Sequence, residues 1–296
     1  MNTTSLRIAV AVATTGRAQV LLETLPLMLA QTRPPDRTLI VAVQDSDVTG
    51  VSAVAPQLEI LFGPRGLCAQ RNLALSATRA DCDIIVFFDD DFIPSRKFIE
   101  NLEVFLQAHP KVVAATGELV ADGINAGGIQ IEDARALVEQ SDDANQSTET
   151  NFWDVNHLYG CNMAARLPIA ATVGFDERLP LYAWQEDRDF SRRLKQHGRV
   201  VRTTTLTGAH LGVTLSRTPG QRLGYSQVAN PVYLLRKGTM KPVETAVLVG
   251  RNVTANIVKT LHPEPWVDRP GRLLGNLKAI ADLARGRITP ERILRL

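Results

Sequence analysis

The chain has 296 residues, of which 45% are hydrophobic and 22% charged, a composition typical of soluble globular proteins. Its net charge of +2 points to no particular partner. Because only 5% of residues are aromatic and no basic-aromatic stripe appears, we expect no nucleic-acid binding. No apolar run approaches the roughly 18 residues of a membrane-spanning helix, and the N-terminus lacks a convincing signal peptide. The three cysteines lack CxxC spacing, which argues against a zinc site or disulfide framework, so we expect a cytoplasmic protein.

The charge is unevenly distributed. Residues 231–296 carry twelve Lys/Arg and five Asp/Glu, a charge of +7, so the preceding residues carry 2 − 7 = −5. A basic, helix-patterned segment on an acidic body is attracted to anionic surfaces such as the inner membrane face. The alternative is an ordinary packed helical subdomain with a solvated basic face. Residues 231–296 are therefore expected either to contact the membrane surface peripherally or to form an ordinary packed helical subdomain.

The first 120 residues alternate strand-like and helix-like patterns, which predicts a parallel sheet covered by helices. Pro26 is expected to kink the first helix. We predict strands at 6–14, 37–43, 58–62, 84–89 and 111–116, and helices around 22–29, 67–78 and 94–108.

Residues 121–151 are rich in Gly, Asn, Ser, Asp and Thr, which predicts a long surface segment with one short helix near 134–139. Such a segment is a usual place for a lid or substrate loop. An extended stretch at 158–164, a helix at 184–197 and a strand at 200–205 follow. After Pro219 the pattern is helical, and Leu273, Leu277, Ile280 and Ala284 lie on one stripe.

The most informative segment is Ile84–Pro94, where an apolar strand ends in Asp89, Asp90 and Asp91. In open α/β sheets, ligands bind beyond the carboxyl ends of the strands. Three clustered carboxylates repel one another unless a cation sits among them, and oxygen-rich sites suit Mg²⁺ or Mn²⁺ bridging to phosphates. The alternative is a solvated strand end whose aspartates cap the next helix.

Two further candidates follow. Glu186, Asp187 and Asp189 lie in the first turns of a predicted helix, where the helix dipole keeps a carboxylate ionised, as a general base requires. Acidic residues are also common at helix starts for structural reasons alone. His210 lies in a predicted glycine-flanked loop after a strand, and its value as a ligand depends on a nearby metal.

These segments, in this order, resemble the inverting family 2 glycosyltransferases, which have the GT-A fold. The resemblance covers roughly residues 6–215 and implies an α/β fold with a Rossmann-like mixed sheet, flanking helices and a C-terminal helical extension. It divides the chain into a nucleotide-sugar half (1–120), an acceptor half (121–217) and the extension (218–296). The matching segments are Val12–Arg17 and Gln31–Ile40 (like Q-T-x-P-P), Gly66–Asn72 (like G-x-x-x-A-R-N), Asp89–Asp91 (D-x-D), Gly160–Met163 with Gly174–Glu177 (G-x-N-M and G-F-D-E), and Glu186–Phe190 (like E-D-x-D-L).

The resemblance implies a nucleotide-diphosphate sugar donor, a hydroxyl acceptor and Mn²⁺ or Mg²⁺ as cofactor. Asp187 would be the base that deprotonates the acceptor. The other implied roles are nucleotide-sugar binding by Thr14, Arg17, Asp45, Arg71, Asp89 and Asp90, metal ligation by Asp89, Asp91 and His210, and acceptor binding by Trp184, Glu186 and Asn162.

Two departures from the family pattern qualify this reading. Gln44-Asp45 stands where relatives often have paired aspartates. The Q-x-x-R-W motif and transmembrane helices of processive synthases are missing, so we expect transfer of a single sugar, with a role in bacterial surface polysaccharide or glycolipid assembly as a hypothesis.

Two other functions match the sequence less well. A sugar nucleotidyltransferase would have a glycine-rich signature after the first strand, and Ala13–Arg17 is poor in glycine. An inactive nucleotide-sugar-binding scaffold would more often have lost the metal motif or the base, and both are present. Kinase P-loop and dinucleotide-binding motifs do not occur.

Overall fold

The computed structural model describes residues 5–144, 151–214 and 218–296. It has two compact units, and we describe each by itself. The first comprises Met1–Arg65, Ala69–Gly174 and Phe190–Ser216, and the second comprises Gly66–Cys68, Phe175–Asp189 and Arg217–Leu296.

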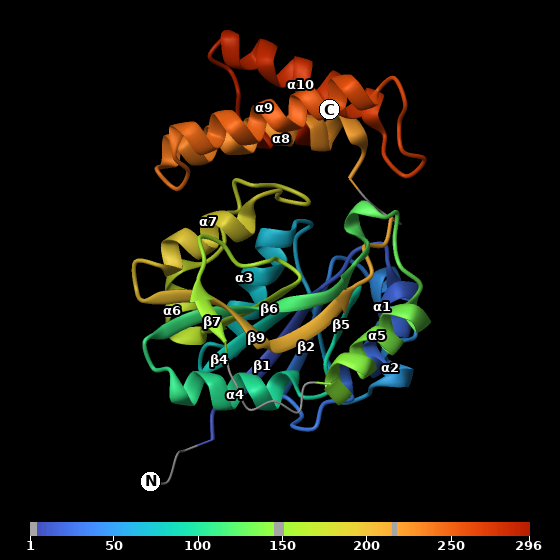
Figure 1. Ribbon diagram of the computed structural model, residues 1–296, viewed down its shortest axis with the longest axis vertical. Helices are drawn as coiled ribbons and strands as arrows, with labels where there is room; N and C mark the ends of the chain where they lie inside the picture. The colour runs from blue at the N-terminus through green and yellow to red at the C-terminus, as the bar shows by residue number, and fades with distance from the viewer. Residues whose placement is uncertain (1–4, 145–150, 215–217) are drawn as a thin grey trace. The chain divides into compact units, whose positions relative to one another are not determined.

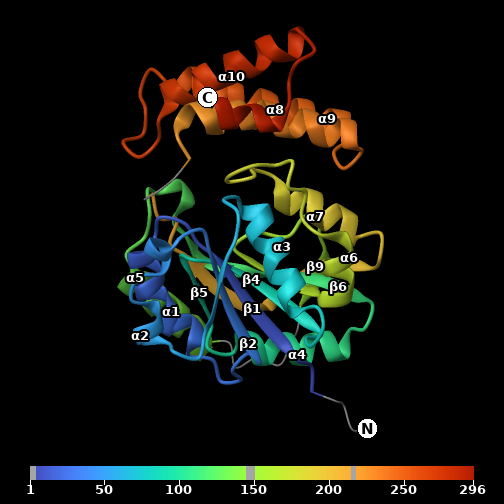
Figure 2. The same cartoon turned by 180° about the vertical axis from the view of Figure 1, so that it is seen from behind.

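The first unit is built on a mixed sheet with the order β3-β2-β1-β4-β8-β6-β9-β5, and β7 pairs with β9. β1 pairs in parallel with β2 and β4, and β6 pairs in parallel with β9. β8 runs antiparallel between β4 and β6, so β1, β2, β4, β6 and β9 all point the same way (Figures 1 and 2). The strands are β1 Ile8–Ala13, β2 Arg37–Ala42, β3 Glu59–Phe62, β4 Ile84–Asp89, β5 Phe92–Pro94, β6 Val112–Asp122, β7 Phe152–Asp154, β8 Asn162–Arg166 and β9 Arg199–His210.

Helices flank this sheet and form most of the second unit. The predicted α/β class with a helical C-terminal region is therefore confirmed. The helices are α1 Ala18–Leu29, α2 Val51–Val54, α3 Leu67–Thr78, α4 Phe98–Ala108, α5 Ile131–Ala144, α6 Leu167–Val173, α7 Glu186–Leu194, α8 Gly220–Lys237, α9 Pro242–Lys259 and α10 Arg269–Ala284, with 3₁₀ turns η1 Asp45–Val48, η2 Gly123–Asn125 and η3 Pro290–Arg295.

The central strands are apolar along their whole length because both faces of the sheet are covered. In β1, Ile8, Val10 and Val12 pack into the main core with the apolar faces of α1 and α4. The alternate residues Ala9 and Ala11 are equally buried. This explains why the strand pattern reads as a continuous run with no polar alternation.

The segment 121–151 is more regular than its composition predicts. β6 continues to Asp122, and α5 spans 14 residues where only a short helix at 134–139 was expected. α5 buries Ala134 and Val138 in a cluster with Ala209 and other apolar side chains, and this distant packing stabilises the longer helix. Residues 145–150 of this segment lie outside the described residues.

Two other boundaries were wrong. Phe92–Pro94 forms a strand, and α4 begins only at Phe98, not at Pro94. β9 runs to His210, so this histidine ends a strand and does not lie in a loop. In both cases the reason is the pairing of β5 with β9, which joins Phe92 to His210 across more than a hundred residues of sequence.

In the second unit, α8, α9 and α10 pack together (Figure 2). Glycines allow α8 and α10 to approach closely, because a Cβ atom at Gly224 would lie 2.0 Å from the Arg272 carbonyl oxygen and one at Gly275 would lie 2.1 Å from that of Gln221. The stripe noted in the sequence faces outward: Leu277 and Ile280 are exposed, whereas Ala279 is buried. Across the part of the chain that the structure describes, we find no helix with both the length and the apolar character of a bilayer-spanning segment.

Candidate functional site

Four parallel strands bring polar side chains to one edge of the sheet. β1, β4, β6 and β9 all end there, and the register sets Ala13 beside Asp89 and Asp122 beside His210. β5 returns antiparallel and places Phe92 next to His210. Asp91 lies in the turn between β4 and β5, so the pairing of β5 with β9 brings it close to the histidine.

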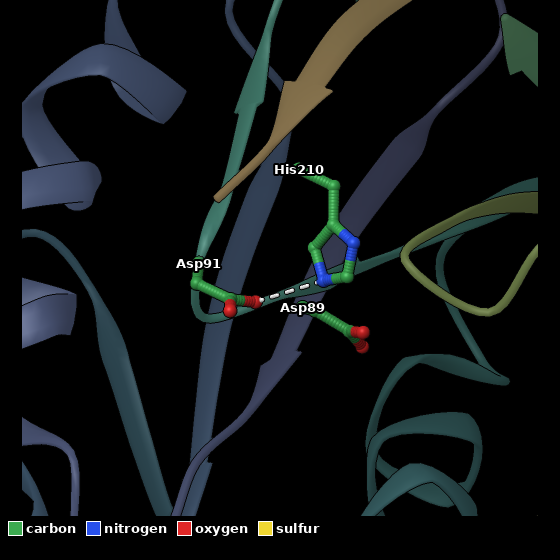
Figure 3. A group of neighbouring side chains, drawn as sticks. All are labelled: Asp89, Asp91 and His210. Atoms are coloured by element: carbon green, nitrogen blue, oxygen red, sulfur yellow. Dashed lines mark ion pairs between the residues drawn. The ribbon is translucent and has the colours of Figure 1, made fainter. Parts of the chain in front are cut away.

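Asp89, Asp91 and His210 form a cluster that could hold a metal ion. One ligand atom from each residue lies within 4.8 Å of the others. Asp91 and His210 are buried, and His210 Nε2 lies 3.4 Å from Asp91 Oδ1 (Figure 3). Asp91 Oδ1 is buried and accepts no hydrogen bond from the described residues. A buried carboxylate oxygen without a donor is costly, so the residues present fit a divalent cation.

Asp122 orients the His210 ring. Its Oδ1 lies 3.0 Å from His210 Nδ1, and the Tyr159 hydroxyl donates to Oδ2 at 2.8 Å. This contact occupies Nδ1 and leaves Nε2 directed at Asp91, the arrangement found for histidines that bind metals. Although burial lowers the pKa of His210, its contacts with Asp122 and Asp91 raise it to about 10. The cluster therefore carries a proton on the imidazole that a bound cation would replace.

Asp91 remains ionised in this setting. Burial raises its pKa, but the contact with the His210 imidazole and its charge, the charge of Arg17 and the Val213 N–H lower it below its usual value. The Val213 N–H donates to Oδ2 at 2.8 Å, so the two oxygens of this carboxylate have different roles. Oδ2 is held by the backbone, and Oδ1 is available to a ligand.

The Asp90 side chain is hydrogen-bonded to Thr14 and Arg17. The Thr14 hydroxyl donates to its Oδ2 at 2.8 Å, and Arg17 Nη1 donates to its Oδ1 at 2.9 Å. Complete burial raises the pKa of Asp90 to about 6, although Arg17 opposes this shift. Thr14 and Arg17, expected at the nucleotide, thus have their side chains on Asp90 and fix the loop after β1.

Arg71 connects α3 to the acidic edge. It is buried, with one nitrogen 3.1 Å from Asp89 Oδ1 and 2.9 Å from the Gly160 carbonyl oxygen. Its guanidinium lies over the Phe87 ring, 5.7 Å from the centroid. The arginine therefore holds the Asp89 carboxylate and supplies a fixed positive charge beside it.

Asp45 is not one of the residues of this cluster. Asp45 is exposed in η1, whereas Asp47, which the sequence analysis missed, is fully buried. Asp47 accepts hydrogen bonds from the Gly16 N–H at 2.7 Å and the Val43 N–H at 3.1 Å, and so ties the ends of β1 and β2 together. The only sequence signal for Asp47 is that it is a second carboxylate, two residues after Asp45 in the same turn.

Asn162, expected on the acceptor side, is fully buried in β8 opposite Phe88 of β4. Its Oδ1 accepts a hydrogen bond from the Thr116 hydroxyl. Its Nδ2 donates to no acceptor among the described residues. Like Asp91, Asn162 is therefore a buried polar residue of the first unit with one side-chain atom that is not hydrogen-bonded to the described residues.

Trp184, Glu186 and Asp187 belong to the second unit. α7 begins at Glu186, as predicted to within two residues, and the Arg188 N–H donates to Asp187 Oδ1 at 2.7 Å. Asn230 Nδ2 donates to the Trp184 carbonyl oxygen at 2.8 Å, which anchors the approach to the helix.

The backbone before α7 is strained. Leu181, Ala183 and Gln185 have φ values of 59°, 54° and 79°, a region that residues other than glycine seldom occupy. Three such residues within five positions persist only where the surroundings dictate the conformation, and such strain clusters at functional sites. The segment that leads into Asp187 is thus held in one specific shape.

The two aspartates of α7 differ in their surroundings. Asp189 is fully buried, with Lys237 Nζ 2.8 Å from one oxygen and the Thr239 hydroxyl 2.8 Å from the other. Asp187 is partly exposed at the first turn. Asp189 therefore has a structural role, and Asp187 is the carboxylate that a ligand can reach.

Comparison with solved structures finds GT-A glycosyltransferases. The mannosyltransferase PcManGT from Pyrobaculum calidifontis, in complex with GDP-Man and Mn²⁺, has a TM-score of 0.55 at 16% identity over 99% of this chain and 86% of that one. S. aureus TarS 1-349 with UDP-GlcNAc has a TM-score of 0.57 at 14% identity over 97% and 83%. Glucosyl-3-phosphoglycerate synthase from Mycobacterium tuberculosis, with Mn²⁺, UDP and glucosyl-3-phosphoglycerate, has a TM-score of 0.53 at 16% identity over 79% and 80%. At these identities the likeness establishes the fold.

Comparison with curated protein sequences gives no significant match. The family described as glycosyl transferase family 2 matches residues 9–165, more than half of the chain, including the acidic strand end of β4. With this match and the GT-A fold, the chain belongs to glycosyl transferase family 2 and is a glycosyltransferase.

Proposed function

We propose that the chain is a metal-dependent glycosyltransferase that moves a single sugar, with inversion, from a nucleotide-diphosphate sugar to a hydroxyl acceptor. The observation that carries this proposal is the cluster of Asp89, Asp91 and His210 at the carboxyl edge of the sheet, in which Asp91 and His210 are buried. The complexes of PcManGT with GDP-Man and Mn²⁺ and of TarS with UDP-GlcNAc support a donor of this class.

Asp89, Asp91 and His210 would hold Mn²⁺ or Mg²⁺. Such a cation, when bound, neutralises the negative charge that grows on the departing nucleoside diphosphate. Asp122 keeps the imidazole of His210 in the orientation that ligation needs, through the 3.0 Å contact with Nδ1. Arg71 fixes Asp89 and adds a positive charge beside the same edge.

Asp187 would act as the general base. It lies at the N-terminal turn of α7, where the helix dipole favours the ionised carboxylate. It takes the proton from the acceptor hydroxyl as that oxygen bonds to the anomeric carbon, while the bond from this carbon to the diphosphate oxygen breaks. The transition state resembles an oxocarbenium ion, and one direct displacement inverts the anomeric configuration.

Trp184, Glu186 and Asn162 are proposed to shape the acceptor site, and Thr14, Arg17 and Asp45 to lie near the nucleotide. Thr14 and Arg17 would act mainly through Asp90, which both of them contact. A role in surface polysaccharide or glycolipid assembly fits single-sugar transfer to a hydroxyl.

Product analysis tests the proposal. The protein is incubated with a panel of UDP-, GDP- and dTDP-sugars and Mn²⁺, with candidate lipid and glycan acceptors, and the products are identified by mass spectrometry and anomeric NMR. We expect a nucleoside diphosphate and a glycoside of inverted configuration, and neither product in EDTA or with Asp91→Asn. Release of pyrophosphate would instead identify a sugar nucleotidyltransferase. Transfer that proceeds equally in EDTA would contradict the metal-dependent reaction.

A further inference from the structure

The C-terminal helices α9 and α10 bury polar side chains and expose apolar ones, although an apolar cluster around Tyr225 of α8 also lies in their interior. The buried positions of α9 are Thr245 and Asn256, and those of α10 include Asn276 and Asp282. A helix on the surface of a protein in water normally shows the opposite arrangement, with its apolar side facing the core.

Hydrogen bonds and close packing hold this interior together. Asn256 Nδ2 donates to Gln227 Oε1 and to Asn276 Oδ1, each at 2.8 Å, and Asn276 Nδ2 donates to the Gly224 carbonyl oxygen at 2.6 Å. Arg269 Nη1 donates to Oδ1 of the same Asn256 amide at 2.9 Å. Small residues at the crossing and amides bonded across helices are the features by which helices associate where apolar burial gives no advantage.

The exterior of α9 carries an apolar stripe that is interrupted in its middle by Gly250, Arg251 and Thr254. Val243, Val247 and Val258 lie on one face by helical spacing, opposite Asn256, and Val243 is 76% exposed. Ile257 extends the stripe, and Leu261 continues it just beyond the helix.

α10 exposes a second apolar face of the same kind. Leu277, opposite the buried Ala279, is 55% exposed, and its large apolar neighbours are exposed as well. Apolar side chains gathered in this way, and not scattered singly, mark a surface that meets a partner. The exposed members on α10 are Leu274, Leu277, Ile280 and Leu283.

The charge of this region selects the partner. Residues 231–296 carry +7, and each of their five carboxylates already has a contact within the second unit. Arg251, Lys278, Arg285 and Arg287 are exposed and enter none of the ion pairs that the described residues form. The carboxylate contacts are Glu244 with Arg188, Glu264 with Lys259 and Arg269, Asp268 with the Gly271 N–H, Asp282 with Arg292 and Glu291 with Arg178.

A second copy of this chain would set two strongly basic segments against each other, whereas an anionic lipid surface complements both the charge and the apolar faces. We propose that the outer faces of α9 and α10 dock onto an anionic lipid bilayer, with apolar side chains among the headgroups and basic side chains at the phosphates. Helices of this type lie in the plane of the interface and do not cross it. The surface includes none of the residues assigned to glycosyl transfer, so docking onto lipid can be tested independently of the proposed reaction.

Vesicle flotation with the full chain tests this proposal without any donor or acceptor. Vesicles of phosphatidylcholine alone are compared with equimolar phosphatidylcholine and phosphatidylglycerol, at low and high salt. We expect binding only to the anionic vesicles, weakened by salt because the basic side chains are screened. Leu277→Glu with Ile280→Glu should weaken binding at least about tenfold, because two apolar side chains no longer enter the interface.

Two controls keep the test decisive. Val104→Glu replaces a 63% exposed side chain on α4 of the first unit and should leave vesicle binding unchanged. Val247→Glu on α9 provides a second variant if the α10 double variant fails to fold by circular dichroism. No binding to anionic vesicles at low salt would overturn the proposal. An equal loss of vesicle binding in Val104→Glu would also overturn it. So would a dimer in solution that Leu277→Glu with Ile280→Glu dissociates, if the wild-type chain does not bind vesicles.

Discussion

The Asn256–Asn276 network in the C-terminal helices and Asp91 at the sheet edge differ in how completely they are hydrogen-bonded. In the helices, both ends of the Asn256 amide have partners, as do both ends of Asn276. At the sheet edge, Asp91 Oδ1 accepts nothing from the described residues although it is buried. A satisfied network stabilises one conformation, while an unsatisfied group at a strand end indicates that something else is meant to bind there.

Among the substitutions predicted here, Asp187→Asn should change the transfer rate most, and Asp189→Asn on the same helix should act differently. Asp187→Asn should lower the transfer rate by about 10²- to 10⁴-fold and leave donor binding unchanged, because an amide cannot accept the acceptor proton. The measurement is steady-state transfer at saturating donor, with donor affinity determined separately.

Asp189→Asn is the matched substitution on the same helix. It breaks the buried pair with Lys237 and should cost about 3 kcal/mol of unfolding free energy. Transfer that survives in Asp187→Asn would remove the assignment of the base, even if Asp189→Asn behaves as expected.

Removing the unsatisfied carboxylate should abolish metal-dependent donor binding. Asp91→Asn is expected to weaken Mn²⁺ binding by at least about 100-fold, since loss of an outer partner alone costs about 10- to 100-fold. Thermal shift with nucleoside diphosphates in Mn²⁺ or EDTA measures this, because a ligand of the folded state raises the melting temperature. A stabilisation by metal and nucleotide that persists in Asp91→Asn would exclude this carboxylate as a ligand.

Asp122 gives a smaller, positioning effect. Asp122→Asn should weaken Mn²⁺ binding about 10- to 100-fold by releasing the His210 ring from its orientation. Tyr159→Phe removes only the hydroxyl that donates to Asp122, so it should have the weaker effect of the two. Calorimetric titration with Mn²⁺ compares them, and equal affinities in wild type and Asp122→Asn would show that ring orientation does not limit binding.

The smallest effect concerns the satisfied network. Asn256→Ala should lower the unfolding free energy by about 1–3 kcal/mol, because it leaves buried partners without hydrogen bonds. Thr254→Ala, at an exposed position of the same helix, should change it by less than about 0.5 kcal/mol. Urea unfolding measures both, and Mn²⁺ affinity should be unchanged in each. Weakened Mn²⁺ binding in Asn256→Ala would show that the two polar regions are not independent.

The sequence predicts well what depends on local pattern. The bounds of α3 match the expected 67–78, and β4 ends in the aspartate triplet as its apolar run requires. Both signals lie within a dozen neighbouring residues. The grouping of Asp89, Asp91 and His210 followed from family resemblance, and the structure brings the three together.

Contacts between distant segments could not be predicted. Asp122 meets His210 only because β6 pairs with β9, and Thr14 meets Asp90 only because β1 lies beside β4. The outward stripe of α10 depends on which side of the helix α8 covers, which periodicity alone does not reveal. For the same reason the sequence alone does not distinguish the exposed Asp45 from the buried Asp47.

Electron–nuclear double resonance of bound Mn²⁺ shows whether Asp89, Asp91 and His210 hold the metal. We predict one Mn²⁺ per chain with a coupling to a single imidazole nitrogen, which disappears in His210→Ala. Bound Mn²⁺ with no nitrogen coupling, or the same coupling in His210→Ala, would contradict this assignment.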